Sequence, residues 1–140
     1  MRSRLAIFLA ALWWGSLSSL GALVVPLLFK YLDTPAAAGA MAARLFSAQT
    51  WLSIACAMLL LLAFNRPDDE DWRAAGQRVL KFVVAGLLLA LLVEFAVAPQ
   101  IVSARATGAS LRLWHGLGTA MYLGQWLCAA TVLWRLSRRG

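Results

Sequence analysis

Four long, mostly apolar runs constrain the fold of this chain more than any other feature. Three cover Leu5–Phe29, Leu45–Asn65 and Leu113–Trp134, and the fourth is KFVVAGLLLALLVEFAVAPQ, from Lys81 to Gln100. The apolar core of a bilayer is about 30 Å thick, which a helix of about 20 residues crosses. These runs are apolar all the way round, whereas a helix on a soluble core needs a polar face. At 62% hydrophobic residues and a length of 140, the chain is too apolar for a soluble domain.

We therefore predict an all-α membrane protein made of one domain, residues 1–140, with four transmembrane helices in an antiparallel bundle. The helices are expected at about residues 5–29, 43–64, 79–99 and 112–135. Arg2 and Arg4 before the first run also resemble the start of a secretory signal. That run is 25 residues long and no clear A-x-A cleavage site follows it, so an uncleaved first helix is favoured.

The basic residues predict the orientation of the helices. With helices at these positions, nine Lys and Arg residues fall on one side: Arg2, Arg4, Arg66, Arg73, Arg78, Lys81, Arg135, Arg138 and Arg139. The other side has four: Lys30, Arg44, Arg105 and Arg112. By the positive-inside rule both termini should be cytoplasmic, in the inner (plasma) membrane of a cell. The net charge of +7 comes without aromatic and basic residues interleaved, which argues against nucleic acid as a partner.

Glu94 is the acid inside the third predicted span. An ionised acid near the middle of a bilayer costs about 2.5–3.5 kcal/mol on insertion scales. It should therefore be neutral, be paired with a partner, or face a water-filled gap. Gly86, Ala90, Glu94 and Ala98 are spaced by four, so three small residues and the acid share one helix face. This face is expected to pack against protein rather than lipid.

His115, the only histidine, is the first candidate partner. If the third and fourth helices are antiparallel and joined by residues 100–112, Glu94 and His115 lie at similar depths. Such a pair would be a polar centre suited to a proton relay or a partial metal site. The alternative is that Glu94 only fixes helix register through one of these groups: Arg105, Arg112, His115, Ser18 or Ser19.

Small residues four apart predict close packing on three helices. They are Gly15 and Ser19 in the first, Gly86 and Ala90 in the third, and Gly116, Ala120 and Gly124 in the fourth. Pro26 and Pro99 are expected to end or kink their helices. The strings LVVP and AVAP around them indicate a duplicated helical hairpin. Asp33 or Thr34 is expected to cap the helix of the second span, with Pro35 as its first residue.

The remaining reactive side chains do not form a recognisable site. Asp68, Asp69, Glu70 and Asp71 are consecutive, which favours a helix start over a divalent-cation site because no calcium-loop spacing accompanies them. Cys56 and Cys128 lie inside predicted spans and are expected to be small apolar fillers. No nucleophile elbow, phosphate loop, dinucleotide fingerprint or zinc motif occurs. The sequence therefore disfavours an enzyme and predicts neither a metal site nor a bound cofactor.

Four short motifs carry a family resemblance: PLLF (Pro26–Phe29), ARLF (Ala43–Phe46), Pro99 closing the third span, and LWHG (Leu113–Gly116). With these the chain resembles the small four-helix membrane proteins named after transmembrane protein 205, also catalogued as domain of unknown function 4149. The resemblance implies a four-helix integral membrane protein and no established reaction. In the family a serine and an asparagine would follow His115 one and two turns on, where this chain has Gly118 and Tyr122. A shared polar site around the histidine is therefore not implied.

Three functions remain open at this point. The leading hypothesis is permeation or sensing of a small solute or ion around Glu94 and His115. The second is a membrane protein that handles haem or copper, with His115 as ligand, paired across an oligomer or with Met58 or Met121. The third is a structural or assembly subunit of a membrane complex. The expected partners are the lipid bilayer and either further copies of the chain or another membrane protein.

Overall fold

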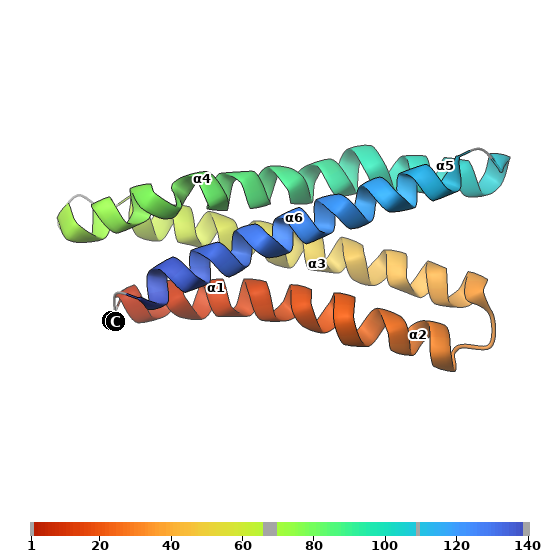
Figure 1. Cartoon of the computed structure of the whole chain (residues 1–140), viewed down its shortest axis with the longest axis horizontal. Helices are drawn as coiled ribbons and strands as arrows, with labels where there is room; N and C mark the ends of the chain where they lie inside the picture. Colours follow the sequence, from red (N-terminus) through yellow and green to blue (C-terminus); the bar gives the residue numbers. More distant parts are fainter. Residues whose placement is uncertain (1, 66–69, 109, 139–140) are drawn as a thin grey trace.

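The computed structural model describes residues 2–65, 70–108 and 110–138. These residues form helices joined by short connections. In chain order they are α1 (Arg2–Ser19), η1 (Leu20–Val24), α2 (Val25–Tyr31), α3 (Pro35–Phe64), α4 (Glu70–Leu92), η2 (Val93–Val97), α5 (Ala98–Thr107) and α6 (Leu111–Ser137). The two η segments are single π-helical turns whose flanking residues keep helical backbone angles. α1, η1 and α2 therefore make one long rod, and α4, η2 and α5 make a second (Figure 1).

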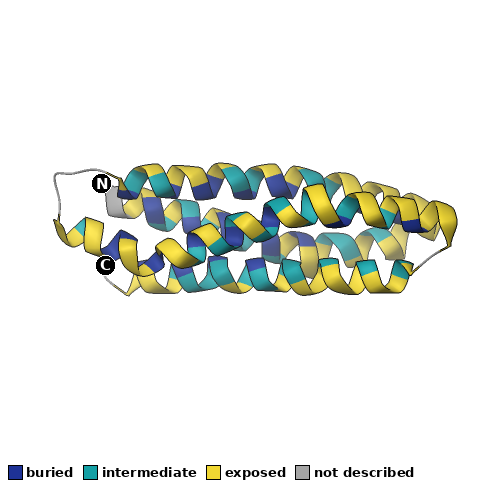
Figure 2. Ribbon diagram, turned by 90° about the horizontal axis from the view of Figure 1, so that it is seen from above, coloured by how far each residue is buried: buried dark blue, intermediate teal, exposed yellow. Residues whose placement is uncertain are grey.

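The rods and the two remaining long helices lie side by side along one axis (Figure 1). α1 contacts α3 and α6, and α4 contacts the same two helices. Both chain termini lie at one end of the molecule, which we call the terminal end (Figure 2). Residues 32–34, Gly108 and Ser110 lie at the other end, which we call the loop end (Figure 1).

Among the described residues, three helical stretches are long and apolar enough to cross a membrane: Arg4–Tyr31, Pro35–Phe64 and Glu70–Thr107. Large apolar side chains point outward from them; Phe8 is 72% exposed and Phe95 62%. Burying such side chains in hydrocarbon is worth about 1.5–3 kcal/mol each, so these surfaces fit contact with lipid. The chain has the helices of a membrane protein. α6, at 27 residues, is slightly shorter and less apolar than these stretches, and its crossing of the membrane stays a prediction.

The tightest packing lies in the terminal half of the molecule. Trp13, Leu17 and Leu60 are fully buried there, with Val83 and Val132 beside them. The Trp13 ring reaches from α1 to α4, because a Cβ atom added at Gly86 would lie 2.6 Å from its Cη2 atom. Glycine at 86 thus makes room for an indole in the centre of the molecule.

The helix ends follow local sequence signals. The Thr34 hydroxyl accepts a hydrogen bond of 3.1 Å from the Ala37 N–H, and Pro35 is the first residue of α3. This confirms the predicted cap, with Thr34 rather than Asp33 in the role. Glu70 and Asp71 lie in the first turn of α4, where acids stabilise free N–H groups. Asp68 and Asp69 lie outside the described residues.

The third helix extends further than predicted: it was expected at 79–99 and runs without a break from Glu70 to Thr107. The helix of the second span begins at Pro35, as its predicted cap requires, eight residues before the span expected from residue 43. Pro99 does not end its helix, and neither does Pro26. Each follows a π-helical turn that makes room for the ring, so the rod continues.

Several small residues predicted to pack closely face outward instead. A methyl group at Gly15 or Gly116 would meet nothing within 4 Å, and Ser19 and Ala120 are exposed. Small side chains allow close approach only where the helix face meets a neighbour, and spacing alone does not say which face does. Gly86 and Ala90 are buried, and a Cβ at Gly124 would lie 3.2 Å from Leu89 Cδ1.

Candidate functional site: a polar layer around Glu94

The two π-helical turns occupy equivalent places in their rods. η1 is followed by Val25-Pro26 and η2 by Ala98-Pro99. A proline inside an α-helix has no N–H and its ring collides with the carbonyl four residues earlier. A π turn relieves the collision by adding one residue, and hydrogen bonds then run five residues back: Val25 N–H to Leu20, and Ala98 N–H to Val93. Such turns are rare and frequently found at functional sites.

Glu94 is the second residue of η2, and Gly21 is the second residue of η1. The two halves of the chain thus share a local backbone geometry in addition to a short sequence string. A Cβ at Gly21 would lie 3.1 Å from Cε1 of Tyr122, so the first half has a glycine under an aromatic ring where the second half has a carboxylate. The acid is a feature of one half alone.

The carboxylate of Glu94 is half-buried and is held by α3. The Ser47 hydroxyl donates a 2.5 Å hydrogen bond to Glu94 Oε1. A serine hydroxyl both donates and accepts. The same contact therefore survives if Glu94 takes up a proton, with the direction of the bond reversed.

A backbone oxygen next to the carboxylate lacks its usual helical donors. The Ala98 N–H bonds to Val93, and Pro99 has no N–H to give. The carbonyl oxygen of Glu94 thus receives neither the bond from four residues on nor the bond from five residues on. Glu94 therefore has a carboxylate and a backbone carbonyl without its helical N–H donors, and the Ser47 hydroxyl lies next to the carboxylate.

Further polar contacts lie at the same level of the molecule. Gln49, two residues after Ser47, is buried and donates from Nε2 to Ser16 Oγ at 2.9 Å. On the opposite side of α1, Trp126 Nε1 donates to Ser18 Oγ at 2.7 Å. These contacts join α1, α3, η2 and α6. We call the set the polar layer: Ser16, Ser18, Ser47, Gln49, Glu94, Tyr122 and Trp126.

Tyr122 closes the polar layer from α6. Its hydroxyl donates a 2.8 Å hydrogen bond to the Leu17 carbonyl, and its ring meets the Phe46 ring edge-on with 5.2 Å between centroids. In hydrocarbon each unpaired polar group is costly, and these partners lie within the protein. The layer is therefore compatible with the interior of a membrane protein.

Among the residues that the structure describes, three buried donors close to the polar layer have no hydrogen-bond partner: Trp13 Nε1, Trp14 Nε1 and Gln125 Nε2. Trp13 and Trp14 lie within about one helical turn of Ser16 and Ser18, on the terminal side. Gln125 lies between Tyr122 and Trp126 on α6. Most buried polar atoms in proteins are paired, so three donors in one region stand out. They provide hydrogen-bonding capacity between Glu94 and the terminal end.

The structure does not bring Glu94 together with its predicted partners. Among the described residues no hydrogen bond or ion pair joins it to His115, Arg105 or Arg112. His115 and Arg112 are exposed near the loop end, and Arg105 Nη2 lies 3.0 Å from where a Cβ at Gly39 would be. The reason is the length of the third helix. Because α5 continues to Thr107, Glu94 lies about 13 Å deeper than His115 rather than level with it.

Sequence reasoning missed Ser47, Gln49 and Ser16. A signal was present in α3, where Ser47, Thr50 and Ser53 recur every three residues within an otherwise apolar run. Such a row indicates a helix face turned toward protein. Thr50 and Ser53 are indeed buried.

The ligands for a metal or haem do not gather in the part of the chain that is described. No group of three or more His, Cys, Asp or Glu side chains there is placed to hold a metal ion. Cys56 and Cys128 are free thiols, and Met58 is exposed. The role of His115 as a haem or copper ligand stays a prediction.

Comparison with known families now identifies the chain. The model of a family described as a domain of unknown function, DUF4149, matches residues 8–110. The chain belongs to the DUF4149 family. The match includes η1, Ser47 and Glu94, together with Pro26 and Pro99. It ends before α6, so the LWHG motif and Tyr122 lie beyond it. No curated protein and no solved structure matches the chain.

Proposed function

We propose that this DUF4149 protein spans the inner membrane four times, with both termini in the cytoplasm. The lengths of the rods, the outward-facing apolar side chains and the length of α6 support four crossings. Basic residues such as Arg78, Lys81, Arg135 and Arg138 gather toward the terminal end, as the positive-inside rule requires of a cytoplasmic face. The single domain 1–140 is part of the same proposal.

Within this arrangement we propose that Glu94 reversibly binds a proton or a small cation and that the protein passes or senses that ion. The contact that carries the proposal is the hydrogen bond from Ser47 to Glu94, because it holds the acid in both protonation states. The carbonyl of Glu94, without its helical donors, adds an oxygen that a cation accepts as ligand. Intramembrane carboxylates are costly and mark ion or proton pathways in many membrane proteins.

The unpartnered donors within the polar layer and beside it support a route toward the terminal end. Trp13, Trp14 and Gln125 offer N–H groups within the protein, and the serines of the polar layer offer hydroxyls. A carboxylate that served only to fix helix register would not need them. His115 is not part of the proposed ion-binding site at Glu94; it is a separate, exposed side chain near the loop end.

Reaction with a hydrophobic carbodiimide tests whether Glu94 titrates, since this reagent modifies protonated carboxyl groups within membranes. The full-length protein in liposomes is treated across a range of pH, and modification is located by peptide mass spectrometry. We expect modification of Glu94 that declines as pH rises and as the transported cation is added. Absence of modification at Glu94 at every pH, with exposed carboxyls modified, would contradict proton binding.

Ion flux in the same liposomes tests the function itself. Proton, sodium and potassium fluxes are compared for the unchanged chain, Glu94→Gln and Glu70→Gln. The last is the matched control, because Glu70 is an exposed acid in the first turn of α4. We expect Glu94→Gln to reduce flux to the level of empty vesicles and Glu70→Gln to leave it unchanged. Equal flux in all three proteins would remove permeation from the proposal.

A further inference from the structure

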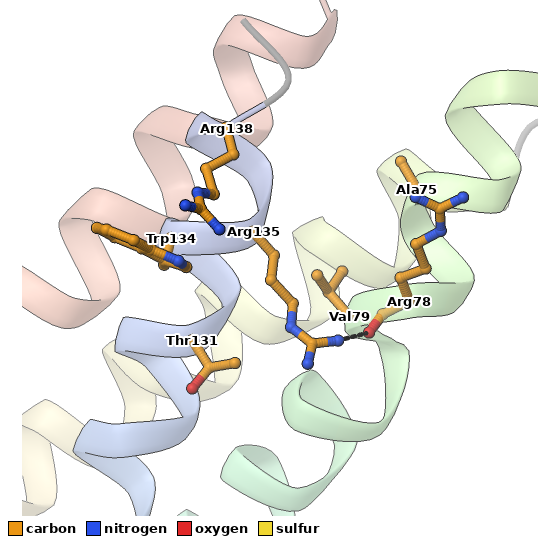
Figure 3. Close-up of a pocket in the computed structure, with 7 residues that line it drawn as sticks. All are labelled: Ala75, Arg78, Val79, Thr131, Trp134, Arg135 and Arg138. Atoms are coloured by element: carbon orange, nitrogen blue, oxygen red, sulfur yellow. Dashed lines mark hydrogen bonds between the residues drawn. The ribbon is translucent and has the colours of Figure 1, made fainter.

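A basic groove lies between α4 and α6 at the terminal end, away from the polar layer. It has a volume of about 620 Å³ and is lined from both helices. Three arginines surround it: Arg78 from α4, and Arg135 and Arg138 from α6 (Figure 3). Val79 and Ala75, both buried, provide an apolar wall. A groove with positive groups around an apolar wall fits a ligand with a negative head and an apolar body.

Arg135 is fixed in place by contacts within the protein. Its Nη1 donates a 3.0 Å hydrogen bond to the Arg78 carbonyl, which bridges the two helices (Figure 3). Its guanidinium also lies 4.7 Å from the centroid of the Phe82 ring. A guanidinium has five N–H donors, so this hydrogen bond leaves the others available. Arg135 is thus an ordered wall of the groove.

Arg78 and Arg138 are free to bind an anion. Arg138 lies over the Trp134 ring, 4.9 Å from its centroid, and both arginines are exposed. Within residues 70–108 and 110–138, no carboxylate forms an ion pair with Arg78, Arg135 or Arg138. Three arginines line one groove, and within the described residues none of them is paired with an acid, which leaves a positive field that favours phosphate oxygens.

The position of the groove favours a lipid over a free anion. Trp134, on the groove's border, is 61% exposed, and tryptophan prefers the boundary between headgroups and hydrocarbon. Leu127, one turn below Thr131 on α6, is 58% exposed. From the terminal end toward the middle of the molecule, α6 thus presents arginines, then Trp134, then exposed leucine. A phospholipid bound along α6 would place its phosphate at the arginines and its acyl chains at the leucine.

We propose that this groove binds the phosphate headgroup of an anionic phospholipid, with Arg78 and Arg138 on the phosphate and Arg135 as the fixed wall. Basic pockets between membrane helices on the cytoplasmic side bind such headgroups. The site does not involve Glu94, and the proposal stands whether or not the protein conducts ions. Its consequence is that lipid composition stabilises the contact between α4 and α6.

Lipid retention by the full-length protein tests the proposal. The protein is exchanged into nanodiscs of phosphatidylcholine with a minor share of phosphatidylglycerol, and bound lipid is measured by native mass spectrometry. The test variant combines Arg78→Gln with Arg138→Gln and leaves Arg135 intact. The control combines Lys30→Gln with Arg112→Gln, which removes the same charge at the loop end.

We expect the unchanged chain and the control to prefer phosphatidylglycerol, and the test variant to bind it about thirtyfold more weakly, as the loss of two arginines implies. Equal weakening in the control would mean that overall charge, not the groove, attracts the lipid. Displacement of the lipid by millimolar inorganic phosphate would make the occupant a free anion. Either result overturns the proposal, as does full retention by the test variant. Unfolding in pure phosphatidylcholine is measured first; if the double variant is altered there, the two single substitutions take its place.

Discussion

Replacing Gly86 by alanine should destabilise this protein, although alanine is the better helix former. The added Cβ would lie 2.6 Å from Cη2 and 2.7 Å from Cζ2 of Trp13. Those atoms belong to a rigid ring that is fully buried, so the indole has no free space into which to turn. Cys128 Cβ at 3.3 Å limits movement on the other side.

The expected magnitude follows from two opposing effects. Overpacking of a buried site costs about 1–3 kcal/mol, and the change from glycine to alanine in a helix returns about 1 kcal/mol. We expect a net loss of up to about 2 kcal/mol for Gly86→Ala. Gly15→Ala is the matched control, because a Cβ there meets nothing within 4 Å. It should be neutral or stabilise the protein by up to about 1 kcal/mol.

The free energy of unfolding is measured for the unchanged chain and both variants in mixed micelles, by raising the mole fraction of dodecyl sulfate and following tryptophan fluorescence. Identical chemical changes at two positions should thus shift the transition in opposite directions. If Gly86→Ala unfolds at the same point as Gly15→Ala, the Trp13 ring does not pack on Gly86. The assignment of the core to that contact would then be wrong.

Three further predictions concern the polar layer and a helix cap. A double-mutant cycle of Ser47→Ala and Glu94→Gln should give a coupling energy of about 0.6–1.7 kcal/mol in the same unfolding assay, and independent effects would show that the hydrogen bond is not formed. Pro99→Ala restores a backbone N–H and favours a regular helix, which turns Glu94 away from Ser47. The same double-mutant cycle, repeated in the Pro99→Ala protein, should therefore show little coupling energy. An unchanged coupling energy would mean that the proline does not set the π turn. Thr34→Ala should lower the unfolding free energy by about 1 kcal/mol, whereas Thr34→Ser, which keeps the hydroxyl for the Ala37 N–H, should change it little.

The helical class and the membrane character of the chain follow from the sequence because both depend on local composition. A run such as Leu45–Phe64 has few polar groups to offer water, and a helix satisfies its backbone within the segment. The cap at Thr34 and the start of α4 with Glu70 and Asp71 are equally local, since a cap bonds groups only three residues away.

The candidate site was predicted only in part. Glu94 is recognisable without a structure because a lone acid in hydrocarbon is costly wherever it points. Its partner is not, because Ser47 lies 47 residues away in sequence and many hydroxyls occur within the spans. The expectation that Glu94 and His115 meet depended on where the third helix ends, and a proline in a helix is equally compatible with a break and with a π turn.

By itself, the sequence determined that this chain forms long apolar helices, that one of them carries an acid, and that basic residues flank them unevenly. Each of these is a property of one segment in its surroundings, water or lipid. Only the tertiary structure decided which residues meet: Ser47 with Glu94, Trp13 with Gly86, and Arg135 with the α4 backbone. Those contacts depend on the rotation and register of one helix against another, and a single π turn changes both for every residue beyond it.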